Sequence, residues 1–194
     1  MSLCIRDMLC KCESYWRDTG GEKPVNNMWG RKKYQNKELL IFLDVDGVLN
    51  TTNSRITKYE IREENVSALG ELQDKLVKRG YSVKVILSST WRLGYDAVLE
   101  KCSPQMQKLI SRLEKVNIKL YDKTPIYKEQ TRDVEIRRYL RGYQLEHEEF
   151  SYIILDDDIS IFQENLLEEM NFYKVNEHTG LTKKDADKLL KLFR

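Results

Sequence analysis

The sequence has no long apolar run, only two histidines and almost no net charge. No window offers the roughly 20 apolar residues that a helix needs to span a bilayer, so we expect no membrane-spanning helix. The 33 Lys+Arg residues nearly balance the 31 Asp+Glu residues, and the net charge is +2. This balance argues against a strongly basic nucleic-acid module and against an acidic disordered tail. The 194 residues, at about 150 per domain, fit one self-sufficient folded core.

The chain also lacks the motifs of zinc knuckles, P-loop enzymes and signal peptides. Cys10 and Cys12 are too close for the usual C-x2-4-C spacing, and no Cys/His pair follows at a suitable distance. No G-x4-G-K-[ST] motif occurs, which disfavours a kinase or other P-loop enzyme. The first residues have neither a long apolar core nor a small-residue cleavage site. We therefore expect reduced thiols and a cytoplasmic protein, or one exported by a specialised route into the cytosol of another cell.

From Leu39 onward, short apolar runs alternate with segments that carry apolar residues at helical spacing. We expect strands at 39–43, 83–87, 118–121, 152–155 and 172–175. We expect helices at 63–79, from Pro104 through Leu113, at 132–147 and after Thr182. This alternation predicts βαβ units and therefore an α/β fold, a three-layer Rossmann-like domain with a mostly parallel sheet.

Two helix ends carry their own signals. Gly80 follows the first helical segment and should close it as a C-cap. Thr182 should cap the last helix, with Leu189, Leu190 and Leu192 on the inner face of that helix.

The first 37 residues differ in pattern from the rest of the chain. Residues 2–16 have the periodicity of one amphipathic helix, and a polar stretch with Gly20, Gly21 and Pro24 comes after it. We expect residues 1–37 to form an N-terminal extension, most simply a helix packed on the main domain. Residues 38–194 should form the α/β domain itself.

Three of the expected buried strands end in polar residues that could do chemistry. The first leads into Asp44-Val45-Asp46-Gly47, the second into the segment 88–92 (SSTWR), and a later one into 156–158 (DDD). In open α/β sheets, ligands bind beyond the carboxyl ends of the strands, so these segments should meet. Gathered carboxylates repel one another unless a cation such as Mg2+ balances them. A hydroxyl at Ser88 and nearby backbone N–H groups suit a phosphate. Together these are the parts for phosphoryl transfer.

Each of these signals alone has a simpler explanation. An aspartate after a strand is more often a turn former or a helix cap than a catalyst. The run 156–158 could cap a helix that begins near Ile159. The occurrence of three such segments, in order and each on its own buried strand, favours the functional interpretation.

These residues resemble the haloacid dehalogenase (HAD) superfamily of phosphatases, whose first motif is DxDG[VT]. The segment 42–50 (FLDVDGVLN) matches that motif. Within that superfamily, the sequence is most similar to the phosphatase-like domain of Swiss-army-knife RNA-repair proteins. In that domain a strand ends in SS-[TDS]-WR, as segment 86–92 does in this chain. Segments 124–136, 154–158 and 180–182 are similar to the remaining motifs of that branch.

The resemblance implies a role for each acidic residue. Asp44 would be the nucleophile and Asp46 the general acid/base, with the backbone carbonyl of Asp46 also bound to Mg2+. Asp156 or Asp157 would complete the metal site. Ser88 would bind the transferring phosphoryl group.

The resemblance also implies a cation and substrate contacts. Arg132 is the expected catalytic cation, with Lys128 second and Lys123 a further candidate; for Arg132, a charge on a helix surface is the competing explanation. Substrate contacts are expected from the loop after the second strand, at Ser89, Thr90 and Arg92. A packed Trp91 beside a salt-bridged Arg92 is the alternative there.

The inserted segments leave no room for a full cap domain, which implies an open site and a bulky phosphorylated partner. We expect a phosphoprotein substrate, including phosphotyrosine, with a nucleic-acid 3′-phosphate as the alternative. The rival from another class is a HAD-like binding module without catalytic activity.

Overall fold

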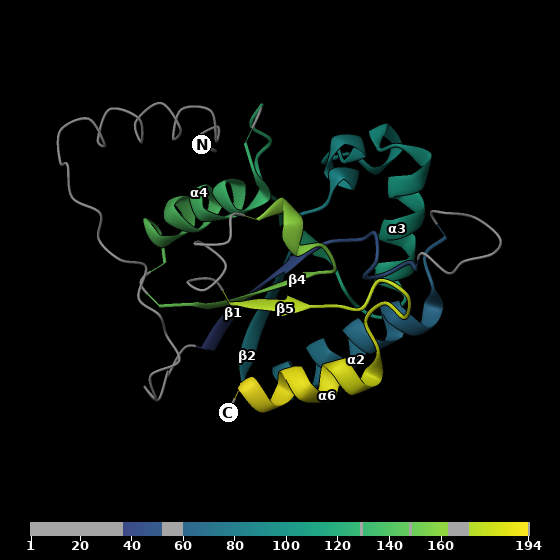
Figure 1. Ribbon diagram of the computed structural model, residues 1–194, viewed down its shortest axis with the longest axis vertical. Coiled ribbons are helices and arrows are strands. Elements are labelled where there is room, and N and C mark those ends of the chain that lie inside the picture. Colours follow the sequence, from purple (N-terminus) through teal and green to yellow (C-terminus); the bar gives the residue numbers. More distant parts are fainter. Residues whose placement is uncertain (1–36, 52–59, 129, 148, 163–170, 194) are drawn as a thin grey trace. The chain divides into compact units, whose positions relative to one another are not determined.

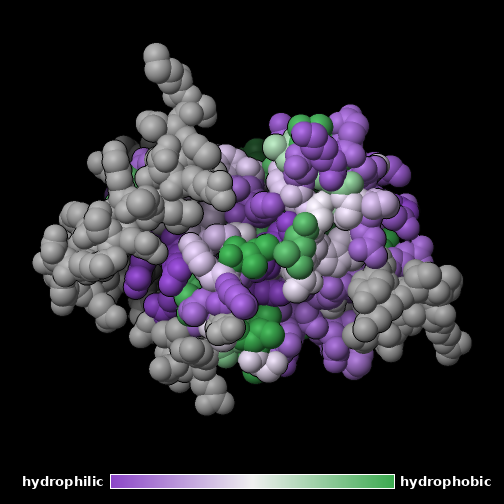
Figure 2. All heavy atoms as spheres, turned by 90° about the horizontal axis from the view of Figure 1, so that it is seen from above, coloured by the Kyte–Doolittle hydropathy of each residue, from purple (hydrophilic) through white to green (hydrophobic). Residues whose placement is uncertain are grey.

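The computed structural model describes residues 37–51, 60–128, 130–147, 149–162 and 171–193, all within a compact unit that spans Lys32–Arg194 (Figure 1). The helix expected at 2–16 lies outside the described residues, and the boundary after residue 37 stays a prediction. Within the described part of the chain, no helix is long and apolar enough to cross a membrane. The face in Figure 2 is largely hydrophilic, in keeping with charged residues making up 33% of the sequence.

Five parallel strands form the sheet in the order β3-β2-β1-β4-β5. Their bounds are Lys37–Leu43 for β1, Tyr81–Leu87 for β2, Leu120–Lys123 for β3, Ser151–Asp156 for β4 and Phe172–Lys174 for β5. The α/β, Rossmann-like fold with a parallel sheet is therefore confirmed. The strand order reverses between β1 and β4, which is where an open α/β sheet forms its ligand crevice.

Helices cover both faces of the sheet (Figure 1). Their bounds are Glu63–Lys78 for α2, Pro104–Glu114 for α3, Arg132–Gln144 for α4 and Lys183–Leu192 for α6. Leu39, Ile41 and Leu43 of β1 share one hydrophobic core with α2, α3 and α6, whereas Leu40 and Phe42 share the other with α4. Because β1 is central and buried on both faces, its sequence from Leu39 to Leu43 is continuously apolar rather than alternating.

The helix ends follow the sequence signals. Arg79 is the C-cap residue of α2, and Gly80 follows it with φ +85°, a conformation that suits glycine at the end of a helix. Ser103 caps α3, because its Oγ accepts from the backbone N–H of Met106 at 3.2 Å. Thr182 and Asp185 form a reciprocal capping box at the start of α6.

Leu192 is not on the inner face of α6 as expected; its side chain is 42% exposed. The buried stripe of this helix consists of Ala186, Leu189 and Leu190 and continues to Phe193, a spacing of three and four residues that leaves Leu192 outside it.

Several bounds of the strands and helices differ from expectation, by one to three residues. Strand β3 begins at Leu120 rather than at Ile118, because the N–H of Ile118 bonds to the carbonyl of Leu113 and still closes α3. Helix α4 ends at Gln144 rather than near His147. Three short 3-10 helices, at Thr90–Gly94, Leu99–Lys101 and Ile159–Ile161, were not expected from the periodicity, which cannot register elements of one turn.

Asn65 of α2 anchors the segment that leads into α6. Its Nδ2 donates to the carbonyls of Thr179 and Leu181 at 2.9 and 2.8 Å. In turn, the N–H of Leu181 bonds to the carbonyl of Val48 in the turn after β1, at 2.8 Å. A buried amide therefore links α2, the C-terminal segment and the turn that follows the central strand.

We predict that Asn65→Ala lowers the free energy of unfolding by about 2–3 kcal/mol, because the buried carbonyl of Leu181 and the partly buried carbonyl of Thr179 lose their donor. Urea denaturation would measure the change. The control is Gln73→Ala on the same helix, which removes an exposed bond to the carbonyl of Asn117 and should cost about 0.5 kcal/mol or less. Equal losses in the two variants would contradict the anchoring role.

Candidate functional site

The site lies where the chain leaves three adjacent strands. Asp44 follows β1 directly, Ser88 follows β2, and Asp156 is the last residue of β4. The N–H of Asp44 bonds to the carbonyl of Leu155 at 3.0 Å, and the N–H of Ser88 bonds to that of Leu43 at 2.8 Å. The sheet ladder thus continues past the strand ends and fixes these residues side by side at the switch point, as the sequence predicts.

Three carboxylates gather at this edge, and we call Asp44, Asp156 and Asp157 the acidic cluster. Each offers an oxygen within 4.8 Å of the others. Arg132, the first residue of α4, bridges two of them: its Nη1 lies 2.7 Å from Oδ1 of Asp44 and 2.6 Å from Oδ2 of Asp156. The side chains of Asp44 and Asp156 are buried, so this ion pair is largely shielded from water.

Gly47 allows the turn after β1 to lie against the cluster. Its φ is +71°, and a Cβ built on it would lie 2.2 Å from Cγ of Asp157. Any larger residue would therefore strain the backbone and collide with a carboxylate of the cluster.

The donor set fits a hard divalent cation. All three groups offer carboxylate oxygens, the ligands that Mg2+ prefers. The guanidinium of Arg132 pairs with two of the three carboxyl groups, so a further positive charge would complete the balance. The glycine at position 47 leaves room for the carboxylate of Asp157 at the turn. The cluster can thus hold a metal ion.

Burial raises the pKa of all three members of the cluster, Asp156 included. The pKa of Asp44 rises from 3.8 to about 7, mainly by burial and further by the charges of Asp156 and Asp46, although Arg132 opposes the shift. The pKa of Asp157 rises to about 6, again mainly by burial and then by the charge of Asp156. A bound cation would oppose these shifts by stabilising the ionised forms.

Asp46 is held outside the acidic cluster. Its Oδ1 accepts from Nδ2 of Asn50 at 2.7 Å, and its Oδ2 accepts from the indole Nε1 of Trp91 at 3.0 Å. Asn50 is itself oriented, because its Oδ1 accepts from the N–H of Gly47 at 2.8 Å. The Asp46 side chain is not one of the grouped carboxylates, and the proposed contact of its backbone carbonyl with metal stays a prediction.

The two serines after β2 have different surroundings. Ser88 is buried, and its Oγ has no hydrogen-bond partner. A buried hydroxyl without a partner beside a ligand crevice is available to a bound phosphate oxygen. The hydroxyl of Ser89 accepts from the N–H of Trp91 at 3.4 Å, and this side chain opposes the rise in the pKa of Asp44.

Thr90 and Arg92, the other expected substrate contacts, have different surroundings. Thr90 is exposed. Arg92 is buried: its guanidinium pairs with Glu135 of α4 and donates from Nη1 to the carbonyl of Ser89 at 2.8 Å. Glu135 also accepts from the N–H of Tyr127 at 3.1 Å. The structure thus shows Arg92 in the salt-bridged arrangement, and a contact with substrate stays a prediction.

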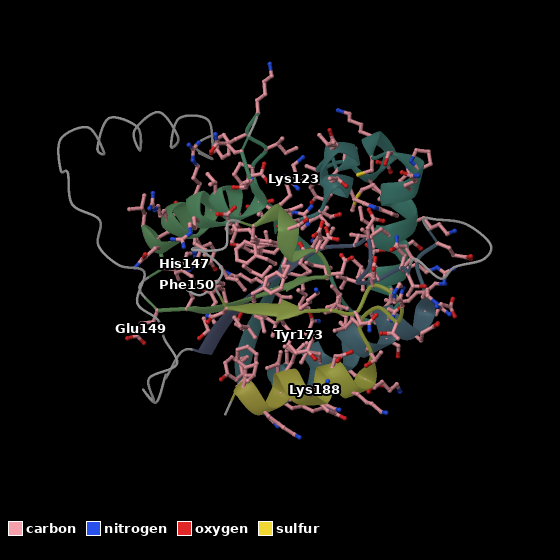
Figure 3. The ribbon with its side chains drawn as sticks, in the orientation of Figure 1. Lys123, His147, Glu149, Phe150, Tyr173 and Lys188 are labelled. Carbon is pink, nitrogen blue, oxygen red and sulfur yellow. The ribbon has the colours of Figure 1, made fainter. Side chains whose placement is uncertain are left out.

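The surroundings of the three candidate cations distinguish them from one another. Arg132 bonds directly to the acidic cluster through Asp44 and Asp156. Lys128, by contrast, is exposed. Lys123 donates to the carbonyl of Tyr95 at 3.0 Å. It ends β3, an edge strand that β2 separates from β1. Figure 3 shows Lys123 far in the view from His147 and Phe150, which precede β4.

Sequence reasoning missed Asn50 and gave no role to Glu135. Asn50 stands at the end of the matched segment 42–50, four residues after Asp46, which is the spacing of a tight turn that folds back on itself. Glu135 stands three residues after Arg132, so both can leave the same side of α4. The spacing of each residue in the sequence was visible, but a spacing alone does not show which side chain Asn50 or Glu135 contacts.

Comparison with known proteins agrees with this geometry. The model of a family described as "HAD domain in Swiss Army Knife RNA repair proteins" matches residues 40–186, more than half of the chain. The matched range begins in β1 and ends in α6, so it includes every residue of the acidic cluster. A search of the curated proteins found no match.

We predict that the metal-free protein loses stability as pH rises from about 4 to about 7. The folded-state pKa values of Asp44 and Asp157 lie above the ordinary 3.8, so the folded state binds more protons than the unfolded state across this window. Adding Mg2+ should raise the melting temperature by at least about 3 °C more at pH 8 than at pH 5, because the cation binds deprotonated carboxylates. Differential scanning fluorimetry would measure both effects.

Asp44→Asn is the control for this pH dependence, since the variant lacks the carboxyl group whose pKa rises to about 7. Its melting temperature should vary less with pH over the same window and respond little to Mg2+. The same slope and the same Mg2+ response in both proteins would contradict the assignment.

Proposed function

Because the chain belongs to the family of HAD domains found in Swiss Army Knife RNA repair proteins, we propose that it is a Mg2+-dependent phosphomonoester hydrolase that acts through an aspartyl-phosphate. One observation carries the proposal: Arg132 bridges Asp44 and Asp156 at the switch point of a parallel sheet. A carboxylate nucleophile, a cation and a candidate metal site thus lie within one hydrogen-bonded group.

Asp44, Asp156 and Asp157 would hold the metal. When bound, Mg2+ neutralises charge on the phosphoryl oxygens and favours the ionised form of Asp44. Ser88 would donate its free hydroxyl to the phosphoryl group. Arg132, whose Nη1 bridges two carboxylates, adds a fixed positive charge beside the reacting atoms.

The reaction has two steps on one phosphorus atom. A carboxylate oxygen of Asp44 forms a bond to phosphorus, and the bond from phosphorus to the ester oxygen breaks, with Asp46 giving its proton to the departing alcohol. Water then attacks the phosphorus of the aspartyl-phosphate. Asp46 takes a proton from that water, and the bond from phosphorus to the Asp44 oxygen breaks. Inorganic phosphate is released, and Asp44 and protonated Asp46 are restored.

For the substrate, we infer a phosphate at a nucleic-acid end, such as an RNA 3′-phosphate. The support is the family description, which names RNA repair. A phosphoprotein, which the sequence alone favours, is the second candidate, because a net charge of +2 offers little general attraction to a polyanion. The third alternative, a binding module without activity, fits poorly with Asp44, Asp46 and Asp156 all being present and positioned.

We predict turnover of p-nitrophenyl phosphate with Mg2+, and loss of that turnover with EDTA. Asp44→Asn should lower kcat/KM by at least about 1,000-fold, because an amide cannot form the phosphorylated intermediate. The control Asp187→Asn removes an exposed carboxylate on α6 that pairs with Lys75, and its activity should stay within about twofold of the parent. Substantial activity in Asp44→Asn would rule out the mechanism.

A second prediction concerns the substrate. Phosphate release should be at least about tenfold faster, as kcat/KM, from a 3′-phosphorylated oligoribonucleotide than from a phosphotyrosyl peptide, a difference of about 1.4 kcal/mol in transition-state binding. Parallel malachite-green assays at one salt concentration would measure it. A preference for the peptide would overturn the nucleic-acid proposal and support the phosphoprotein one, while the phosphatase mechanism would stand.

A further inference from the structure

We propose that Trp91 is a positioning residue, which orients the carboxyl group of Asp46 toward the leaving group of the substrate. The inference rests on the proposed phosphatase function and extends it to a residue that would not itself touch the reacting atoms. It is carried by the hydrogen bonds around Asp46 and by the way in which the loop of Trp91 is fixed to α4 and β3.

Two side chains donate hydrogen bonds to the carboxylate of Asp46, one to each of its oxygens. The indole Nε1 of Trp91 donates to Oδ2 at 3.0 Å, and the amide of Asn50 donates to Oδ1 at 2.7 Å. The amide of Asn50 cannot turn without losing the bond that its own Oδ1 accepts from Gly47. Each oxygen of Asp46 therefore has one lone pair committed to a fixed donor.

This arrangement restricts where a proton on Asp46 can lie. An indole N–H can donate but cannot accept, and the NH2 of an amide likewise only donates. A proton on the carboxyl group must then occupy a lone pair that faces neither Trp91 nor Asn50. The two bonds thus orient the acidic O–H while leaving it free to reach a departing oxygen.

The position of Trp91 is itself fixed by its neighbours in the Thr90–Gly94 helix. Arg92 is buried and pairs with Glu135 of α4. Its backbone carbonyl and that of Tyr95 accept from Nζ of Lys123 at 3.4 and 3.0 Å. The backbone N–H of Trp91 donates to Oγ of Ser89, which caps the helix. The indole ring packs on the main hydrophobic core.

The alternative role for Trp91 is packing alone, and the chemistry of the leaving group separates the two roles. An acid is needed most when the leaving group is a strong base, such as phenolate, and least when it departs without a proton, as 2,4-dinitrophenolate does. Loss of packing would slow both reactions together. Loss of orientation at Asp46 would slow only the first.

The test is Trp91→Phe, which keeps an aromatic ring and removes the N–H. We expect kcat/KM to fall about tenfold or more for phenyl phosphate and to stay within about threefold for 2,4-dinitrophenyl phosphate. In an Asp46→Asn background the same substitution should change the phenyl phosphate value by less than about twofold, because its partner is already lost. Tyr95→Phe, an aromatic change in the same loop, is the control and should alter neither substrate by more than about twofold.

Equal losses on both substrates, no loss on either, or an undiminished effect in the Asp46→Asn background would overturn the inference. Failure of the parent protein to hydrolyse either ester would instead overturn the proposed function, and this inference with it. A measurement independent of activity is the NMR resonance of the Trp91 indole N–H after sequential assignment. The resonance should shift upfield in Asp46→Ala, and an unchanged resonance would contradict the hydrogen bond on which the inference rests.

Discussion

The bridge from Arg132 to Asp44 and Asp156 is the interaction on which the organisation of the site depends. Neither buried carboxylate could stay ionised at low cost without a cation beside it. Because Arg132 begins α4, the bridge also fixes the start of that helix over the strand ends of β1 and β4. The same helix then supplies Glu135 one turn later, and Glu135 holds Arg92 in the loop after β2. One guanidinium thus sets the spatial relation of three segments that are distant in the sequence.

Much of the fold follows from the pattern of apolar residues, and the reasons are visible in the strands. The continuous run from Leu39 to Leu43 fits a strand covered on both faces, and such a strand must lie inside a parallel sheet. The strand ends could be placed together because the carboxyl edge of a parallel sheet collects them. Leu192 shows the limit: the stripe of α6 could run through either Leu192 or Phe193, and packing decided for Phe193.

The parts of the site that the sequence did not reveal are relations between side chains. Ser88, Asp44 and Asp156 could be chosen because each directly follows or ends a buried strand. The partners of Arg92 and Asp46 could not be predicted in this way. They depend on how the short Thr90–Gly94 helix packs between α4 and the turn after β1. That helix places two neighbouring residues in different surroundings: Trp91 meets Asp46, while Arg92 is buried against Glu135.

The bond between Leu181 and Val48 has a consequence for the order in which this site can assemble during synthesis. The turn after β1 emerges from the ribosome early, but the backbone group that braces it lies beyond β5, in the last described segment of the chain. A nascent chain that has completed β1, β2 and β4 can therefore hold the carboxylates without the full support of the turn. The turn after β1 is thus braced fully only once the segment after β5 has been made and has docked against it.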